Sequence, residues 1–311
     1  MKRLFTILSV AFIAVLFSVS AYAQDLSAAA ETYTNAAEAF NAGNKVEALT
    51  GFKKALEEAT ALGEEGAELA SECKKLIPTV LLSLGKDCVT NKDMDKAVVY
   101  LNEAVTLGKE YEQTEVENEA KELIPVVLMA DGDSMLNEGK FAEAVARYNE
   151  VLAADPENAT AYIRTGMCQA KLGNEAAAVE AYTKAAEKGE KEAAYKQLNV
   201  LYSNKAITAY KAKDNAGALE NAQKAGEYGE NLTAAKIGGI AAFNLKKNDT
   251  AIKLLEQVAK ASPDATDVRY YLARAYEAKG NKAKAVENYK KIVGDPKFKA
   301  FAEQKIKALG A

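Results

Sequence analysis

Glutamate side chains are the groups in this sequence whose spacing could perform chemistry. Residues three or four positions apart share one face of a helix, and paired carboxylates can bind Ca²⁺ or hydrolyse a glycosidic bond. Neighbouring lysines favour a solvated surface instead, so a carbohydrate-active enzyme, or a protein that binds a glycan or small ligand through paired Glu, is kept as the alternative function. The glutamates form two groups: Glu64, Glu65, Glu68 and Glu72, then Glu112, Glu115, Glu119 and Glu122.

Histidine is absent from all 311 residues. This excludes His-dependent catalytic triads, His metal sites and imidazole acid–base catalysis. We therefore expect no catalytic residue, no metal site and no cofactor, and we predict that the chain is not an enzyme.

Residues 1–23 have the pattern of a cleaved secretory signal. Lys2 and Arg3 precede an apolar stretch from Leu4 to Ser20, and an Ala-Tyr-Ala motif ends at Ala23. Such a motif suits signal peptidase, so we predict export with cleavage after Ala23. An uncleaved anchor stays open, because the apolar stretch is almost long enough to span a bilayer.

Cleavage would change the formal net charge from −4 to −6, since the signal contains two cations and no anion. An acidic chain without basic tracts does not suit a phosphate backbone, so nucleic acid is not an expected partner. No later segment is apolar enough to span a membrane. We expect a periplasmic protein, or one associated with proteins of the outer membrane.

Three cysteines make an odd set for an oxidising compartment: Cys73, Cys88 and Cys168. The first two are 15 positions apart in one expected helix, about 22 Å along its axis, which is too far for a disulfide. A bridge to Cys168 stays open from sequence, but we expect all three to be small buried side chains.

A repeat organises the rest of the chain. Seven times, an alanine is followed four positions later by a large residue, or by alanine in the fifth copy, and three positions after that by a small or aliphatic one, which places all three on one helix face. A small residue lies twelve positions before each of these alanines, so the unit is helix, turn, helix. The alanines are Ala48, Ala97, Ala144, Ala178, Ala218, Ala251 and Ala285.

The pattern resembles the tetratricopeptide repeat family, in the form of an exported bacterial protein. The third copy has Gly139, Ala144 and Tyr148; the fourth copy has Gly173 and Tyr182. The resemblance covers most of residues 29 to 297, although tryptophan is absent and Ala222 replaces the aromatic residue of the fifth copy. It implies an all-α, right-handed solenoid of about seven antiparallel helix pairs with a C-terminal capping helix.

Four segments follow from this pattern. After the signal at 1–23, residues 24–124 should form repeats with lengthened first helices, because residues 76–105 align with 123–152 at an offset of 47 instead of 34. We expect those helices at about 66 to 91 and 114 to 138, bent at Pro78 and Pro125. Residues 125–297 should form regular repeats continuous with the former, and 298–311 the capping helix.

The resemblance also implies that the first helices line a concave groove. We predict a non-catalytic protein–protein interaction scaffold of the bacterial cell envelope that binds a peptide helix or an extended segment there. Several of the groove residues are equally compatible with packing between repeats, and the lysine and asparagine set of a carboxylate clamp is missing. The predicted groove residues are Ile163, Arg164, Met167, Asn204, Ile207, Tyr210, Lys236, Ile240, Phe243, Tyr270 and Arg274.

Overall fold

Helices make up the architecture of the chain. The computed structural model describes residues 21–310, and no strand occurs among them. Apart from Ala21–Ala23 at the start of α1, the predicted signal lies outside the described residues. The all-α prediction is confirmed.

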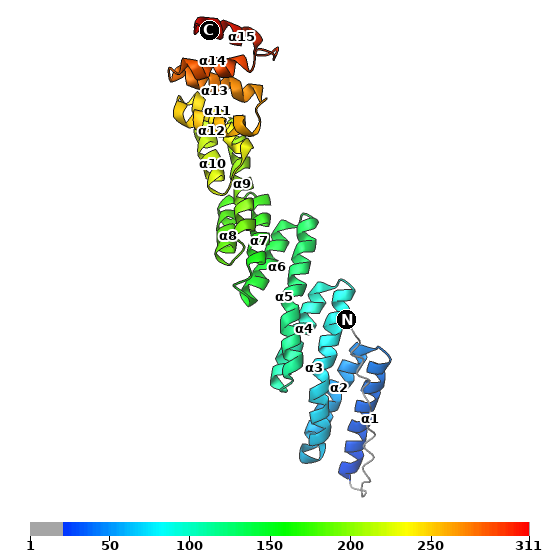
Figure 1. Cartoon of the computed structure of the whole chain (residues 1–311). Helices are drawn as coiled ribbons and strands as arrows, with labels where there is room; N and C mark the ends of the chain where they lie inside the picture. Colours follow the sequence, from blue (N-terminus) through cyan, green and yellow to red (C-terminus); the bar gives the residue numbers. More distant parts are fainter. Residues whose placement is uncertain (1–20, 311) are drawn as a thin grey trace. The chain divides into compact units, whose positions relative to one another are not determined.

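Two compact units divide the chain, residues 1–156 and 157–311. In the first, consecutive helices contact each other and form three antiparallel pairs (Figure 1). Its elements are α1 (Ala21–Asn41), α2 (Lys45–Ala61), the 3₁₀ turn η1 (Gly63–Gly66), α3 (Ala67–Thr90), α4 (Met94–Glu110), α5 (Thr114–Asn137) and α6 (Phe141–Ala154).

The second unit contains four further pairs and a last helix, and here too each helix contacts the next. Its elements are α7 (Ala159–Lys171), α8 (Glu175–Glu187), α9 (Lys191–Lys211), α10 (Asn215–Glu227), α11 (Leu232–Asn244), α12 (Asn248–Ala261), α13 (Thr266–Ala278), α14 (Lys282–Lys290) and α15 (Lys299–Ala308). The described residues thus form a helical solenoid in each unit, with seven pairs altogether and α15 packed on α14.

A close contact between a glycine of the first helix and a large residue of the second closes four of the helix pairs. A Cβ atom built on Gly166 of α7 would lie 2.6 Å from the Tyr182 ring of α8, and one on Gly132 of α5 equally close to Tyr148 of α6. Both tyrosines are buried. The large residue follows the small one by 16 positions, so glycine lets the two backbones approach while the ring fills the space one turn further on.

The fifth pair uses the same positions differently. Ala222 of α10 leaves room that an aromatic ring would occupy, and a Cβ atom built on Gly238 of α11 would lie 2.6 Å from the Ala222 Cβ. Helix α11, which follows this pair, therefore packs closely against Ala222. Helix α9 has 21 residues, against 13 in α7, α11 and α13, which accounts for the longer period of this copy.

The two long first helices, α3 and α5, contain Pro78 and Pro125 in their interiors. Their bounds agree with the ranges that the 47-residue offset predicts. The predicted division at residues 124 and 125 remains an expectation, since the two compact units meet at Pro156 and Glu157.

Glycine in the left-handed region ends several first helices. Gly139 and Gly173 have φ values of 79° and 81°, and the next residue donates its N–H to a carbonyl five positions back, at 2.9 Å in both turns. Lys92, Lys213 and Lys246 adopt a similar φ near 60° in three other turns. Those turns have the same geometry without the glycine that would reveal them in the sequence.

Substitutions of two helical glycines should separate the pair contact from simple helix propensity. Gly166→Ala should lower the free energy of unfolding by about 1–3 kcal/mol, because the new methyl group meets the buried Tyr182 ring. Gly226→Ala on α10 should raise it by up to about 1 kcal/mol, because a Cβ atom there meets nothing within 4 Å. Urea denaturation measures both, and equal effects would contradict the pair contact.

Cysteine labelling should report burial and its effect on thiol pKa. Burial, aided by Glu72, raises the pKa of Cys73 to about 12, while burial and Asp93 raise that of half-buried Cys88. Since the thiolate is the reactive form, a maleimide should modify Cys88 slowly at neutral pH and faster as pH rises, and should spare Cys73 until the protein unfolds. Mass spectrometry of digests, with Cys88→Ser as control, measures this; native labelling of Cys73 as fast as Cys88 would contradict it.

Candidate binding surface

First helices of the C-terminal unit lie next to one another. Helix α9 contacts both α7 and α11, and α11 contacts α13. They therefore share one side of the unit, and every predicted groove residue belongs to one of these four helices. The surface consists of two parts, described in turn: an aromatic cluster on α9, α11 and α13, and a hollow between α7 and α9.

Arg274 of α13 is the centre of the aromatic cluster. Its guanidinium carbon lies 4.8 Å from the centre of the Phe243 ring and 5.3 Å from that of Tyr270. Its Nη1 also donates a hydrogen bond of 3.0 Å to the Tyr270 hydroxyl. The two rings thus fix the plane of the guanidinium, while most of its five N–H donors remain available to a partner.

Tyr271 joins the same cluster and was not among the predicted residues. Its ring packs edge to face on Phe243 and on Tyr270, with centroid distances of 5.7 and 5.2 Å. Its pKa is raised by burial and by Tyr210 of α9, which places Tyr210 beside it. Two adjacent tyrosines on an expected groove helix could have indicated that both belong to the surface.

The capping helix supports the cluster from the other side. Tyr270 stacks on Phe298 at 4.8 Å and packs against Phe301 at 5.3 Å. The structure therefore brings Tyr210, Phe243, Tyr270 and Arg274 together, and it adds Tyr271 and the ring of Phe298.

Lys236 is held by the chain itself. Its Nζ lies 2.5 Å from Asp267 Oδ2 across α11 and α13, with both side chains partly exposed. An exposed pair of this kind contributes at most about 1 kcal/mol. Lys236 and Asp267 compensate each other, whereas Arg274 forms no ion pair with a described carboxylate and acts at longer range on Glu277 of its own helix.

A hollow of about 640 Å³ lies between α7 and α9, with walls from α8 and α10. Two predicted residues, Met167 and Asn204, line it together with Tyr182. An ion pair crosses it, because Lys205 Nζ is 2.5 Å from Glu175 Oε2. Sequence reasoning did not find this hollow, since it depends on how far α9 stands from α7.

The remaining predicted residues take different positions. Ile163 and Ile240 are 7 % and 5 % exposed and belong to the core between helices, which leaves them little surface for a partner. Ile207 is half-buried. Arg164 lies on α7 with its Nη1 4.0 Å from the Met167 sulfur.

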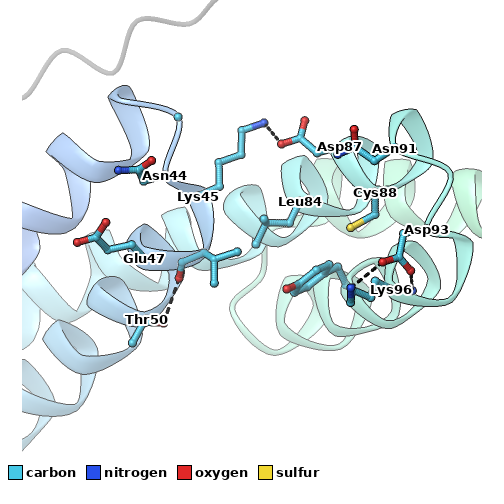
Figure 2. A pocket seen from close by; sticks show the side chains of 13 residues that line it. Asn44, Lys45, Glu47, Thr50, Leu84, Asp87, Cys88, Asn91, Asp93 and Lys96 are labelled. Carbon is cyan, nitrogen blue, oxygen red and sulfur yellow. Dashed lines mark hydrogen bonds and ion pairs between the residues drawn. The ribbon is translucent and has the colours of Figure 1, made fainter.

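The N-terminal unit has a hollow of its own, about 790 Å³, at the start of α2 and the turn from α3 to α4. Figure 2 shows two ion pairs among the residues that line it, Lys45 with Asp87 at 2.6 Å and Lys96 with Asp93 at 2.7 Å. Asp93 also caps α4 by accepting from the Lys96 N–H. Its cations are thus already compensated.

The glutamates of the enzyme alternative lie on the surface. Glu115 and Glu119 of α5 are exposed, and Glu119 pairs with Lys86 of α3 at 2.6 Å. A glycosidase holds two carboxyl groups on either side of the sugar bond in a binding cleft, whereas these two side chains are exposed and one of them has a lysine partner. Over residues 21–310, the structure holds no group of three acidic or thiol side chains placed to bind a metal ion.

None of the described helices is long and apolar enough to cross a membrane. This concerns residues 21–310 and leaves the predicted signal aside.

Comparison with known proteins agrees with the repeat pattern. A tetratricopeptide repeat family model matches residues 130–193 and 238–300, which include the pairs closed by Tyr148, Tyr182, Leu255 and Tyr289. No curated protein matches the sequence.

Among solved structures, the tetratricopeptide repeat protein YrrB, described as having an unusual peptide-binding site, is 21 % identical over 62 % of this chain and 97 % of its own, with a TM-score of 0.38. The MamA protein is 23 % identical over 57 % of this chain and 94 % of its own, with a TM-score of 0.39. The matched segments and the repeated helix-pair contact show that this chain contains tetratricopeptide repeats.

Proposed function

We propose that this chain is a non-catalytic protein–protein interaction scaffold of the bacterial cell envelope, and that it binds a peptide or protein segment on the first-helix side of its C-terminal unit. Proteins of this family generally serve as non-catalytic scaffolds, which supports the scaffold role. The proposed site consists of the aromatic cluster and the α7–α9 hollow.

Arg274 is the observation that carries the proposal. A guanidinium stacked on Phe243 and Tyr270 is held in place before any partner arrives, so little side-chain entropy is lost on binding. Tyrosine and arginine are also enriched among the interface residues whose truncation to alanine weakens binding most. No described carboxylate forms an ion pair with Arg274, in contrast to Lys236.

A photo-crosslinking amino acid placed at Thr208 of α9 should link the partner in cells, because Thr208 is exposed and lines the hollow. The same amino acid at Gln223 or Gln257, exposed on the second helices α10 and α12, should not. Arg274→Gln should reduce the yield at Thr208 by about tenfold, as expected for losing one charged contact, whereas Lys253→Gln on α12 should leave it unchanged.

Each variant should first be shown to melt like the parent protein. Equal crosslinking from first and second helices, or an unchanged yield with Arg274→Gln, would contradict the proposed surface.

Export is tested separately. Fractionation of the native host should recover the protein outside the cytoplasm, with Gln24 as its first residue if the signal is cleaved after Ala23. Intact protein beginning at Met1 in the cytoplasm would contradict the envelope location, and intact protein in the membrane fraction would favour the anchor.

A further inference from the structure

Two amide side chains in the α7–α9 hollow have no hydrogen-bond partner among the described residues. They are Gln197 and Asn204, seven positions apart on one face of α9 and about 10.5 Å apart along its axis. Asn199 on the same helix is different: its Nδ2 donates to the carbonyls of Ala225 and Gly229, both at 2.9 Å. Asn199 thus stabilises the α10–α11 connection, whereas the amides of Gln197 and Asn204 form no hydrogen bond with another described residue.

An amide side chain offers one acceptor and two donors, which complement the N–H and C=O of a peptide group. A helical partner has few such groups to offer, because its backbone is hydrogen-bonded internally. A polyproline II segment makes no hydrogen bonds within its own backbone. With three residues per turn, it presents similarly directed peptide groups about 9.3 Å apart. That spacing is close to the separation of Gln197 and Asn204.

Apolar side chains line the hollow between the two amides. Val200 and Leu201 follow Gln197 by three and four positions, and Val200 is 46 % exposed, an unusual state for a large aliphatic side chain in a hollow. Met167 faces it from α7. One apolar side chain of a partner can therefore be covered between the points where its backbone is held.

The charge of the lining residues favours an acidic residue in the bound segment. Glu175 and Lys205 form an ion pair across the hollow, whereas Lys171 at its rim pairs with no described carboxylate. The lining residues then have a net charge of +1 in a chain whose net charge is −4. A carboxylate on the bound segment would be complementary to Lys171.

We propose that the α7–α9 hollow binds an extended, polyproline II-like segment, held through its backbone by Gln197 and Asn204, with one apolar side chain on Val200 and an acidic residue near Lys171. This rests on the proposed function and names the conformation and chemistry of the segment.

The probe is a displayed library of random linear dodecapeptides, selected on the purified protein. Enriched peptides, made synthetically, should bind Gln197→Leu/Asn204→Leu about tenfold or more weakly, as expected for the loss of two hydrogen bonds. The matched control is Gln223→Leu/Gln257→Leu, which removes two exposed amides from second helices of the same unit and should change the dissociation constant less than about twofold. All four residues lack hydrogen bonds to the described chain, so both double variants should melt like the parent.

Two further measurements test backbone and charge recognition. N-methylation of single peptide bonds removes an N–H without changing a side chain, and at one or two positions it should weaken binding about tenfold. Lys171→Gln should weaken the binding of acidic peptides and reduce its salt dependence, whereas Lys253→Gln should do neither.

Several results would overturn the inference: no enriched peptide, unchanged affinity for the hollow double variant, insensitivity to N-methylation, or peptides that are helical when bound. The crosslinking experiment keeps the two proposals apart. If the native partner is lost with Arg274→Gln but retained by Gln197→Leu/Asn204→Leu, the scaffold function stands and the extended-segment inference fails.

Discussion

The contact between a small residue in one helix and a large residue 16 positions later determines most of this structure. It makes each pair close-packed with few polar groups to satisfy, so a pair is specified by two positions. In the fourth pair these are Gly166 and Tyr182, and in the seventh Ala273 and Tyr289; all four residues are buried. Where a pair is closed by such a contact of its own, neighbouring pairs add their interfaces one at a time, as in other solenoids.

This division of labour also explains why the first helices can carry a binding surface. The large residue of the contact belongs to the second helix, and the first helix contributes only a glycine or alanine to it. Other faces of the first helix are thus left for residues such as Asn204 and Arg274, which the fold does not require. The variation in length among first helices, with 21 residues in α9, then changes the shape of that surface without disturbing the pairs.

The pairs could be predicted from the sequence because the two residues of their contact are always 16 positions apart, and this spacing is visible in the sequence. The 47-residue offset between two copies of the pattern located α3 and α5 in the same way, and the helical spacing of apolar residues located the last helix. The hollow was out of reach, since it depends on the distance between helices whose facing residues have no fixed period. The partnership of Lys236 with Asp267 was likewise missed, because residues 31 positions apart meet only once α11 and α13 are packed. Turns at Lys213 and Lys246 lack a glycine signal because lysine occupies a conformation that usually selects for glycine.

The stacking of Tyr270 on Phe298 and Phe301 has a practical and a biological consequence. The Tyr270 ring that contacts Arg274 also packs on Phe298, just before the last helix, and on Phe301 within it, so residues 298–301 are a structural part of the candidate recognition surface. A protease that trims the tail would release that ring, and with it the orientation of the guanidinium. An affinity tag fused behind Leu309 would follow directly on the helix that contacts this ring, so a tag placed away from the carboxyl end is the arrangement that leaves recognition undisturbed.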